Sequence, residues 1–131
     1  MIEFRIQDED FSIVKEILAI EMVTNLNLNW LNKNGPICLS CENIEFKPPS
    51  KNYRSNIIPI ATIPIILDRG HAKCDEIVAA YWAIEIYFGN KNLYPHIIHQ
   101  GNDYYHAMLI DNTRQVIDPS KLLENKICQY Q

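Results

Sequence analysis

The chain has 131 residues, of which 47% are hydrophobic and 21% are charged, values typical of one globular domain and not of a disordered or fibrous protein. Its formal net charge is -4 and it has no basic run, which argues against binding to nucleic acid. The longest uncharged apolar stretch, Ser55 to Leu67, is broken by two prolines and is shorter than the roughly 18 to 20 residues of a membrane span. We therefore expect a single cytoplasmic domain, 1-131, with no membrane partner.

The four cysteines are expected to be reduced, because the chain begins with an acidic segment instead of a secretory signal. Cys38 and Cys41 form a Cys-x-x-Cys pair that invites a zinc interpretation. A structural zinc site needs four ligands, however, and the chain adds only Cys128 and scattered histidines. We predict no metal and no cofactor.

The N-terminal third is predicted to be an amphipathic helix over 11-26, capped by Asp10, continuing or kinking to Leu31 and ending at 34-36. Its apolar positions recur at three and four residues, with three charged residues on the other side of the helix. The apolar positions are Phe11, Val14, Leu18 and Met22, flanked by Ile13, Ile17 and Ile20, and the charged residues are Lys15, Glu16 and Glu21.

Two extended segments are expected next. Alternation over 37-42 suggests a short strand. The stretch 47-67 holds four prolines, a density that argues against a helix and favours an extended chain laid along the domain, which would deliver Asp68 to His71 to one place.

The most helical segment is 73-88, which is apolar nearly all round and is therefore predicted to be a buried central helix that ends at Gly89. Cys74 lies at its beginning. The segments 94-99, 104-110 and 115-118 are rich in β-forming residues and are predicted to be strands, followed by a short helix through 121-123.

Cys74, His106 and Asp118 follow one another in the order of a catalytic triad. A helix N-terminus and an adjacent imidazolium both stabilise a thiolate, and together they can lower a thiol pKa from about 8.5 into the range of roughly 3.5 to 7.5. An acid that binds the imidazole orients it and fixes its tautomer. We predict that Cys74 is the nucleophile, His106 the general base and acid, and Asp118 the residue that holds the imidazole.

The predicted hairpin gives this triad a testable register. If Asp111 pairs with Gln115, then Met108 lies opposite Asp118, and His106 becomes the diagonal neighbour of Asp118 on the same face. Pairing one residue earlier would put Asp118 on the wrong face. We therefore predict an odd-length loop, Asn112 to Arg114.

These segments resemble the transglutaminase-like superfamily. The similarity lies in Pro64 to Glu76 with Cys74, in Tyr105-His106-Ala107, and in Asp118-Pro119-Ser120, within a core of about 62-123. The resemblance implies an α+β, papain-like fold in which a central helix bearing the cysteine packs on a small antiparallel sheet bearing the histidine and the acid. The N-terminal helix and the proline-rich segment, 1-61, would be additions to that core.

The resemblance implies a cysteine-dependent acyl-transfer enzyme, a peptidase or amidase, acting on a protein or peptide substrate. The alternative is a non-catalytic structural or binding protein that keeps the fold, for example a phage virion or assembly component, which would place it in a virion. His71, Asp75 and Tyr105 are further candidates for the wall of the cleft or for supporting the triad. The backbone N-H of Cys74 can supply one oxyanion donor.

Overall fold

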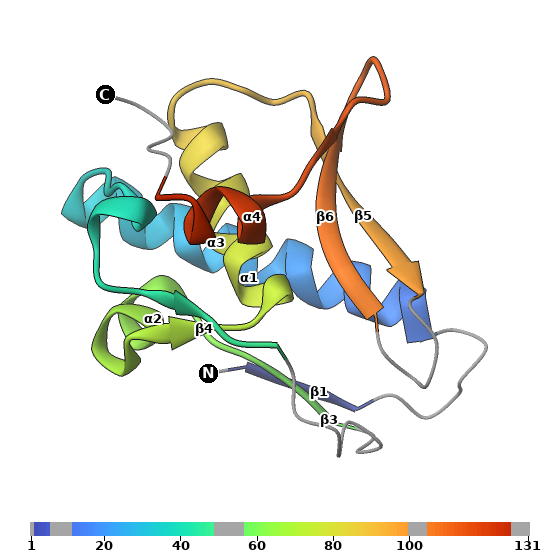
Figure 1. Ribbon diagram of the computed structural model, residues 1–131, viewed down its shortest axis with the longest axis horizontal. Coiled ribbons are helices and arrows are strands. Elements are labelled where there is room, and N and C mark those ends of the chain that lie inside the picture. The colour runs from blue at the N-terminus through green and yellow to red at the C-terminus, as the bar shows by residue number, and fades with distance from the viewer. Residues whose placement is uncertain (1, 6–11, 49–56, 100–104, 127–131) are drawn as a thin grey trace.

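The computed structural model describes residues 2-5, 12-48, 57-99 and 105-126, and these form an α+β domain (Figure 1). The helix α3 lies at its centre, with the long helix α1 on one side and the sheet β5-β6-β7 at one end. The elements in chain order are β1 (Ile2–Arg5), α1 (Ser12–Asn34), the 3-10 turn η2 (Leu39–Cys41), β2 (Glu45–Phe46), β3 (Ile57–Ile60), α2 (Ile63–Arg69), β4 (His71–Ala72), α3 (Cys74–Tyr87), β5 (Leu93–His99), β6 (Tyr105–Asp111), β7 (Val116–Ile117) and α4 (Pro119–Glu124).

Helix α3 is buried because it packs between two hydrophobic clusters, one on each side of the helix. Ile77 and Ile84 belong to a cluster shared with α2, η2 and the end of α1. Val78 and Ala79 belong to a second cluster, shared with the first half of α1 and with β5 and β6. The predicted central buried helix is thus confirmed, and its last turn is followed by Gly89, whose φ of 96° suits glycine.

Helix α1 runs unbroken for 23 residues, but the predicted division of its sides is wrong. Val14, Leu18 and Met22 are each slightly more than half exposed, whereas Glu16 is only 8% exposed. The buried face is the one that packs on α3 and β5; it consists of Glu16, Ala19, Ile20, Val23, Thr24, Asn27 and Leu31. The predicted cap, Asp10, lies outside the described residues.

The three predicted strands, β5, β6 and β7, form an antiparallel sheet with β6 in the middle. The pairing of Leu109 with Ile117 continues to a hydrogen bond from Asp111 N to Gln115 O of 3.0 Å, so the predicted register is confirmed. The intervening loop is the predicted odd-length one, 112-114. Its last residue, Arg114, has a φ of 68°, which completes a three-residue hairpin loop.

Two expectations for the middle of the chain are wrong. The segment 37-42 contains the turn η2 in place of a strand, closed by a hydrogen bond from Cys41 N to Cys38 O. The proline-rich segment forms strand β3 and then helix α2, although its prolines argued against a helix. Pro64 stands in the first turn of α2, where a missing N-H costs no hydrogen bond. Residues 49-56 lie outside the described residues.

Two small strand pairs complete the fold below α3 in Figure 1. Strand β1 pairs antiparallel with β3, and β2 pairs parallel with β4, which leads directly into α3. The pairing of Phe46 with Ala72 brings β2 next to the N-terminus of α3. Among the described residues, the structure contains no helix of the length and apolarity that crossing a membrane requires.

Candidate active site

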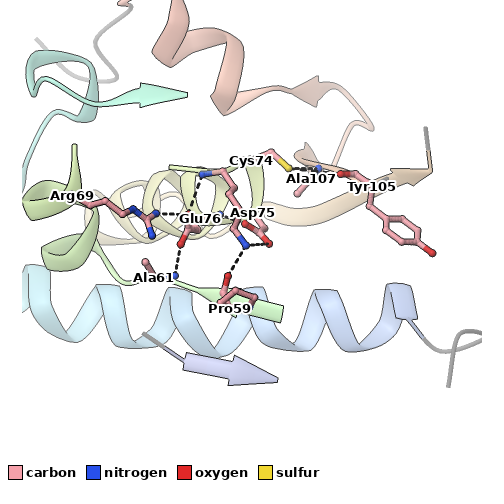
Figure 2. A network of polar contacts seen from close by, with 9 residues as sticks. Pro59, Ala61, Arg69, Cys74, Asp75, Glu76, Tyr105 and Ala107 are labelled. Atoms are coloured by element: carbon pink, nitrogen blue, oxygen red, sulfur yellow. Dashed lines mark hydrogen bonds and ion pairs between the residues drawn. The ribbon is translucent and has the colours of Figure 1, made fainter. Parts of the chain in front are cut away.

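Cys74 is the first residue of α3, and the carboxylate of Glu76 fixes this end of the helix. One oxygen of Glu76 accepts hydrogen bonds from Lys73 N (3.1 Å) and from the Arg69 guanidinium (2.5 Å). The other accepts from Ala61 N at 2.6 Å, and the side chain is fully buried. Figure 2 shows this network beside Cys74. The helix start is therefore tied to both α2 and the end of β3.

The Cys74 thiol lies against the edge of strand β6. Sγ accepts a hydrogen bond from Ala107 N at 3.5 Å and donates to Tyr105 O at 3.9 Å (Figure 2). These backbone groups belong to the two residues that flank His106, so the sulfur is placed directly beside the histidine's own backbone. Within the described part of the chain, no hydrogen bond joins Sγ to the His106 ring.

His106 and Asp118 are in direct contact. Nε2 of His106 lies 2.9 Å from Oδ2 of Asp118, and both side chains are 16% exposed. The other carboxylate oxygen accepts a hydrogen bond from Ser120 N at 3.2 Å, so Asp118 is also the N-cap of α4. Since Asp118 binds Nε2, Nδ1 is the ring nitrogen that remains to accept a proton from a thiol.

The electrostatics of Cys74 differ from the expectation of a lowered pKa. Burial, together with the neighbouring Asp75 carboxylate, raises the pKa of the thiol to about 12, and the backbone hydrogen bond from Ala107 opposes this only in part. The expected stabilisation needs an imidazolium against the sulfur, and Sγ instead contacts backbone. In this arrangement Cys74 is a protonated thiol.

Asp75 lies in a buried acidic pair behind the cysteine. Glu16 of α1 hydrogen-bonds to it, and burial together with the Asp75 charge raises the pKa of Glu16 to about 9. Burial raises the pKa of Asp75 too, while Lys73, whose Nζ is 3.8 Å from Oδ2, opposes that effect. Glu16 is thus the protonated member that donates to the Asp75 carboxylate.

A cleft of about 480 Å³ opens at this site, and the three predicted catalytic residues line it. Tyr105 lines it too, as expected, whereas His71 and Asp75 are not among its lining residues in the described part of the chain. His71 pairs with Glu45 in the β4-β2 ladder, and Asp75 is buried beneath the site. The remaining lining residues are Phe46, Pro48, Ile98, Met108, Ser120, Lys121 and Glu124.

Two residues in or near this site, Ser120 and Glu16, were missed from the sequence. Ser120 is fully buried, and its Oγ has no hydrogen-bond partner among the described residues. Its position two residues after Asp118, in the Asp-Pro-Ser element, was a signal in the sequence. Glu16 gave no signal, because nothing in a helical pattern shows that an acid will meet a second acid from another helix.

The described residues contain no group of three or more histidine, cysteine or acidic side chains that could hold a metal ion. Cys38 and Cys41 lie at η2 and are not among the residues that line the cleft, and Cys128 lies outside the described residues. Comparison with known proteins finds no family model, no curated protein and no solved structure that matches this chain.

Proposed function

We propose that the protein is a cysteine-dependent acyl-transfer enzyme, a peptidase or amidase of transglutaminase-like type with a papain-like core, in which Cys74, His106 and Asp118 form the triad. The observation that carries the proposal is the 2.9 Å contact between His106 and Asp118 in a cleft that Cys74 also lines. A helix that starts at the cysteine and a hairpin that carries the other two residues support it.

The reaction requires Sγ to leave the β6 backbone and meet Nδ1 of His106, so the proposal includes a change in the side-chain rotamer of Cys74. The thiol proton passes to Nδ1 as the sulfur attacks the carbonyl carbon, and the C-N bond breaks as the imidazolium protonates the leaving amine. Water then attacks the thioester and returns its proton through His106 to the sulfur, giving the acid and the free thiol. An amine in place of water gives transamidation.

Alkylation of Cys74 tests the proposal directly. If His106 pairs with the thiol in solution, iodoacetamide labels Cys74 ahead of the exposed Cys41 near pH 6, and His106→Ala removes that preference. Slow labelling of all cysteines alike, with Cys74 responding only at strongly alkaline pH, contradicts the enzyme. Loss of hydrolysis in Cys74→Ala across a peptide and glutamine-amide library then identifies the reaction.

The second candidate is a non-catalytic binding or structural protein, such as a phage virion or assembly component, that retains this fold. It is favoured by the raised pKa of Cys74 and by the backbone contacts of its sulfur. Under this proposal His106 and Asp118 are a structural pair. Cys74→Ser then leaves the protein's binding function intact, whereas the enzyme loses its activity.

A further inference from the structure

The outer face of the sheet β5-β6-β7 carries a row of three apolar side chains, Tyr94, Ile110 and Val116. The register pairs Tyr94 with Ile110 and Ile110 with Val116, so all three share one face. Their neighbours Leu93 and Leu109 are buried in the cluster beneath α1 and α3, which shows that the row points away from the core. Tyr94 is 54% exposed and Val116 is 47% exposed.

This row is continuous with the cleft. Two further rows follow it along the same face: Met108 is the next residue of β6 on that side, and His106, paired with Ile98, comes after it. Met108, His106 and Ile98 all line the cleft. Because Ile110 and His106 are four residues apart in one strand, the apolar row lies about 13 Å from the histidine.

We propose that this apolar row is the outer part of the substrate-binding surface, and that the acyl donor is an extended polypeptide and not a small amide. One apolar side chain of the polypeptide packs in the cleft on Ile98, in the row of His106, and a second packs on Tyr94 and Val116, four residues further along the strands. The inference rests on the proposed function only in identifying the bound chain as a substrate.

The spacing of the two contacts defines the ligand. An extended chain advances about 3.3 Å per residue, and its side chains alternate between faces. Two side chains on the same face about 13 Å apart are therefore four residues apart. A spacing of three or five turns one of them away from the sheet.

The experiment measures binding of fluorescein-labelled twelve-residue peptides to Cys74→Ala by fluorescence anisotropy, since this variant cannot turn them over. The peptides consist of glycine and serine except for two leucines, at positions i and i+n, where the separation n runs from two to six. We expect the tightest binding at a separation of four, with weaker binding at three and five. Val116→Asp and Tyr94→Ser in the Cys74→Ala background should reduce the affinity at separation four at least tenfold, to that of a peptide with one leucine.

Val14→Asp is the matched control, because Val14 is also a half-exposed valine but lies on α1 and does not line the cleft. It should retain the spacing preference. Val116→Thr serves if circular dichroism shows that Val116→Asp has not folded. Affinity independent of spacing, or an equal loss in Val14→Asp, overturns the proposal. So does a dimer in sedimentation that Val116→Asp converts to a monomer, since the row is then a contact between copies.

This test separates the two proposals. A spacing preference in a protein whose Cys74 does not label near pH 6 keeps the polypeptide-binding surface and removes the chemistry. Labelling without a spacing preference keeps the chemistry and overturns the polypeptide donor.

Discussion

Glu16 is a side chain whose charge state depends on folding. Its pKa is raised from 4.5 to about 9, first by burial and then by the carboxylate of Asp75. The unfolded chain ionises Glu16 above its ordinary pKa, whereas the folded chain keeps it protonated. Between these two values the folded state therefore binds more protons than the unfolded state, and stability falls as pH rises.

We predict that the free energy of unfolding declines between about pH 5 and pH 8.5 by at most about 1.4 kcal/mol per pH unit from this group. Glu16→Gln keeps a neutral hydrogen-bond donor to Asp75 and should flatten the decline. Urea unfolding across this range measures it. Glu21→Gln, a change at an exposed position of the same helix, should leave the slope as it is; a flattened slope there would contradict the assignment.

Asp118 has two separable tasks at the scale of an element. One oxygen binds His106, and the other caps α4 through Ser120 N. Asparagine is also a good N-cap, whereas alanine removes the cap at a cost of about 1 kcal/mol.

Asp118→Asn should therefore lower peptide hydrolysis at least tenfold while leaving the urea midpoint close to wild type, because a neutral amide cannot stabilise the imidazolium. Asp118→Ala should lose both activity and about 1 kcal/mol of stability. Parallel activity and unfolding measurements separate the two roles. Equal destabilisation by Asp118→Asn and Asp118→Ala would show that the N-cap of α4 does not contribute the predicted stability.

Helix α1 has apolar residues on nearly every side of its first half. Mutations on its buried face and on its exposed face therefore test which face contributes to stability. Ile20 is fully buried and Leu18 is 52% exposed. Ile20→Ala should cost about 2 to 5 kcal/mol through a lost core contact and the resulting cavity, whereas Leu18→Ala should change stability by less than about 0.5 kcal/mol. Urea denaturation compares them. A larger loss of stability in Leu18→Ala than in Ile20→Ala would show that the buried face is the one predicted from the sequence periodicity.

At the scale of the whole molecule, Glu76 connects segments that are far apart in the sequence. It accepts hydrogen bonds from Ala61 N, Lys73 N and the Arg69 side chain while fully buried. Glu76→Ala leaves two backbone donors and a guanidinium without their acceptor, and we expect a loss of about 3 kcal/mol in urea unfolding. Glu76→Gln retains part of the network and should fall between. A loss below about 1 kcal/mol would show that water replaces the carboxylate.

A structural feature could be predicted from the sequence where neighbouring residues determine it, and could not where packing between distant segments determines it. Helix α3 was predictable because it is apolar all round, and the β6-β7 register was predictable because one odd-length loop determines which face Asp118 occupies. The buried side of α1 was not predictable, since it depends on how α1 packs on α3 and β5, where Glu16 meets Asp75 of a different helix. The contact of Cys74 with the β6 backbone was equally invisible, because it depends on packing between distant segments.

The three-residue loop between β6 and β7 limits which changes in chain length this protein can accept. One residue gained or lost there that shifts the β6-β7 pairing by one position turns Asp118 to the opposite face of the sheet, away from His106, whereas its cap of α4 moves with it because Ser120 is only two residues on. A shift of two residues returns Asp118 to the face of His106. A related chain in which this pairing is shifted by one residue should therefore have lost the contact between the acid and the histidine, even where all three residues of the triad are still present.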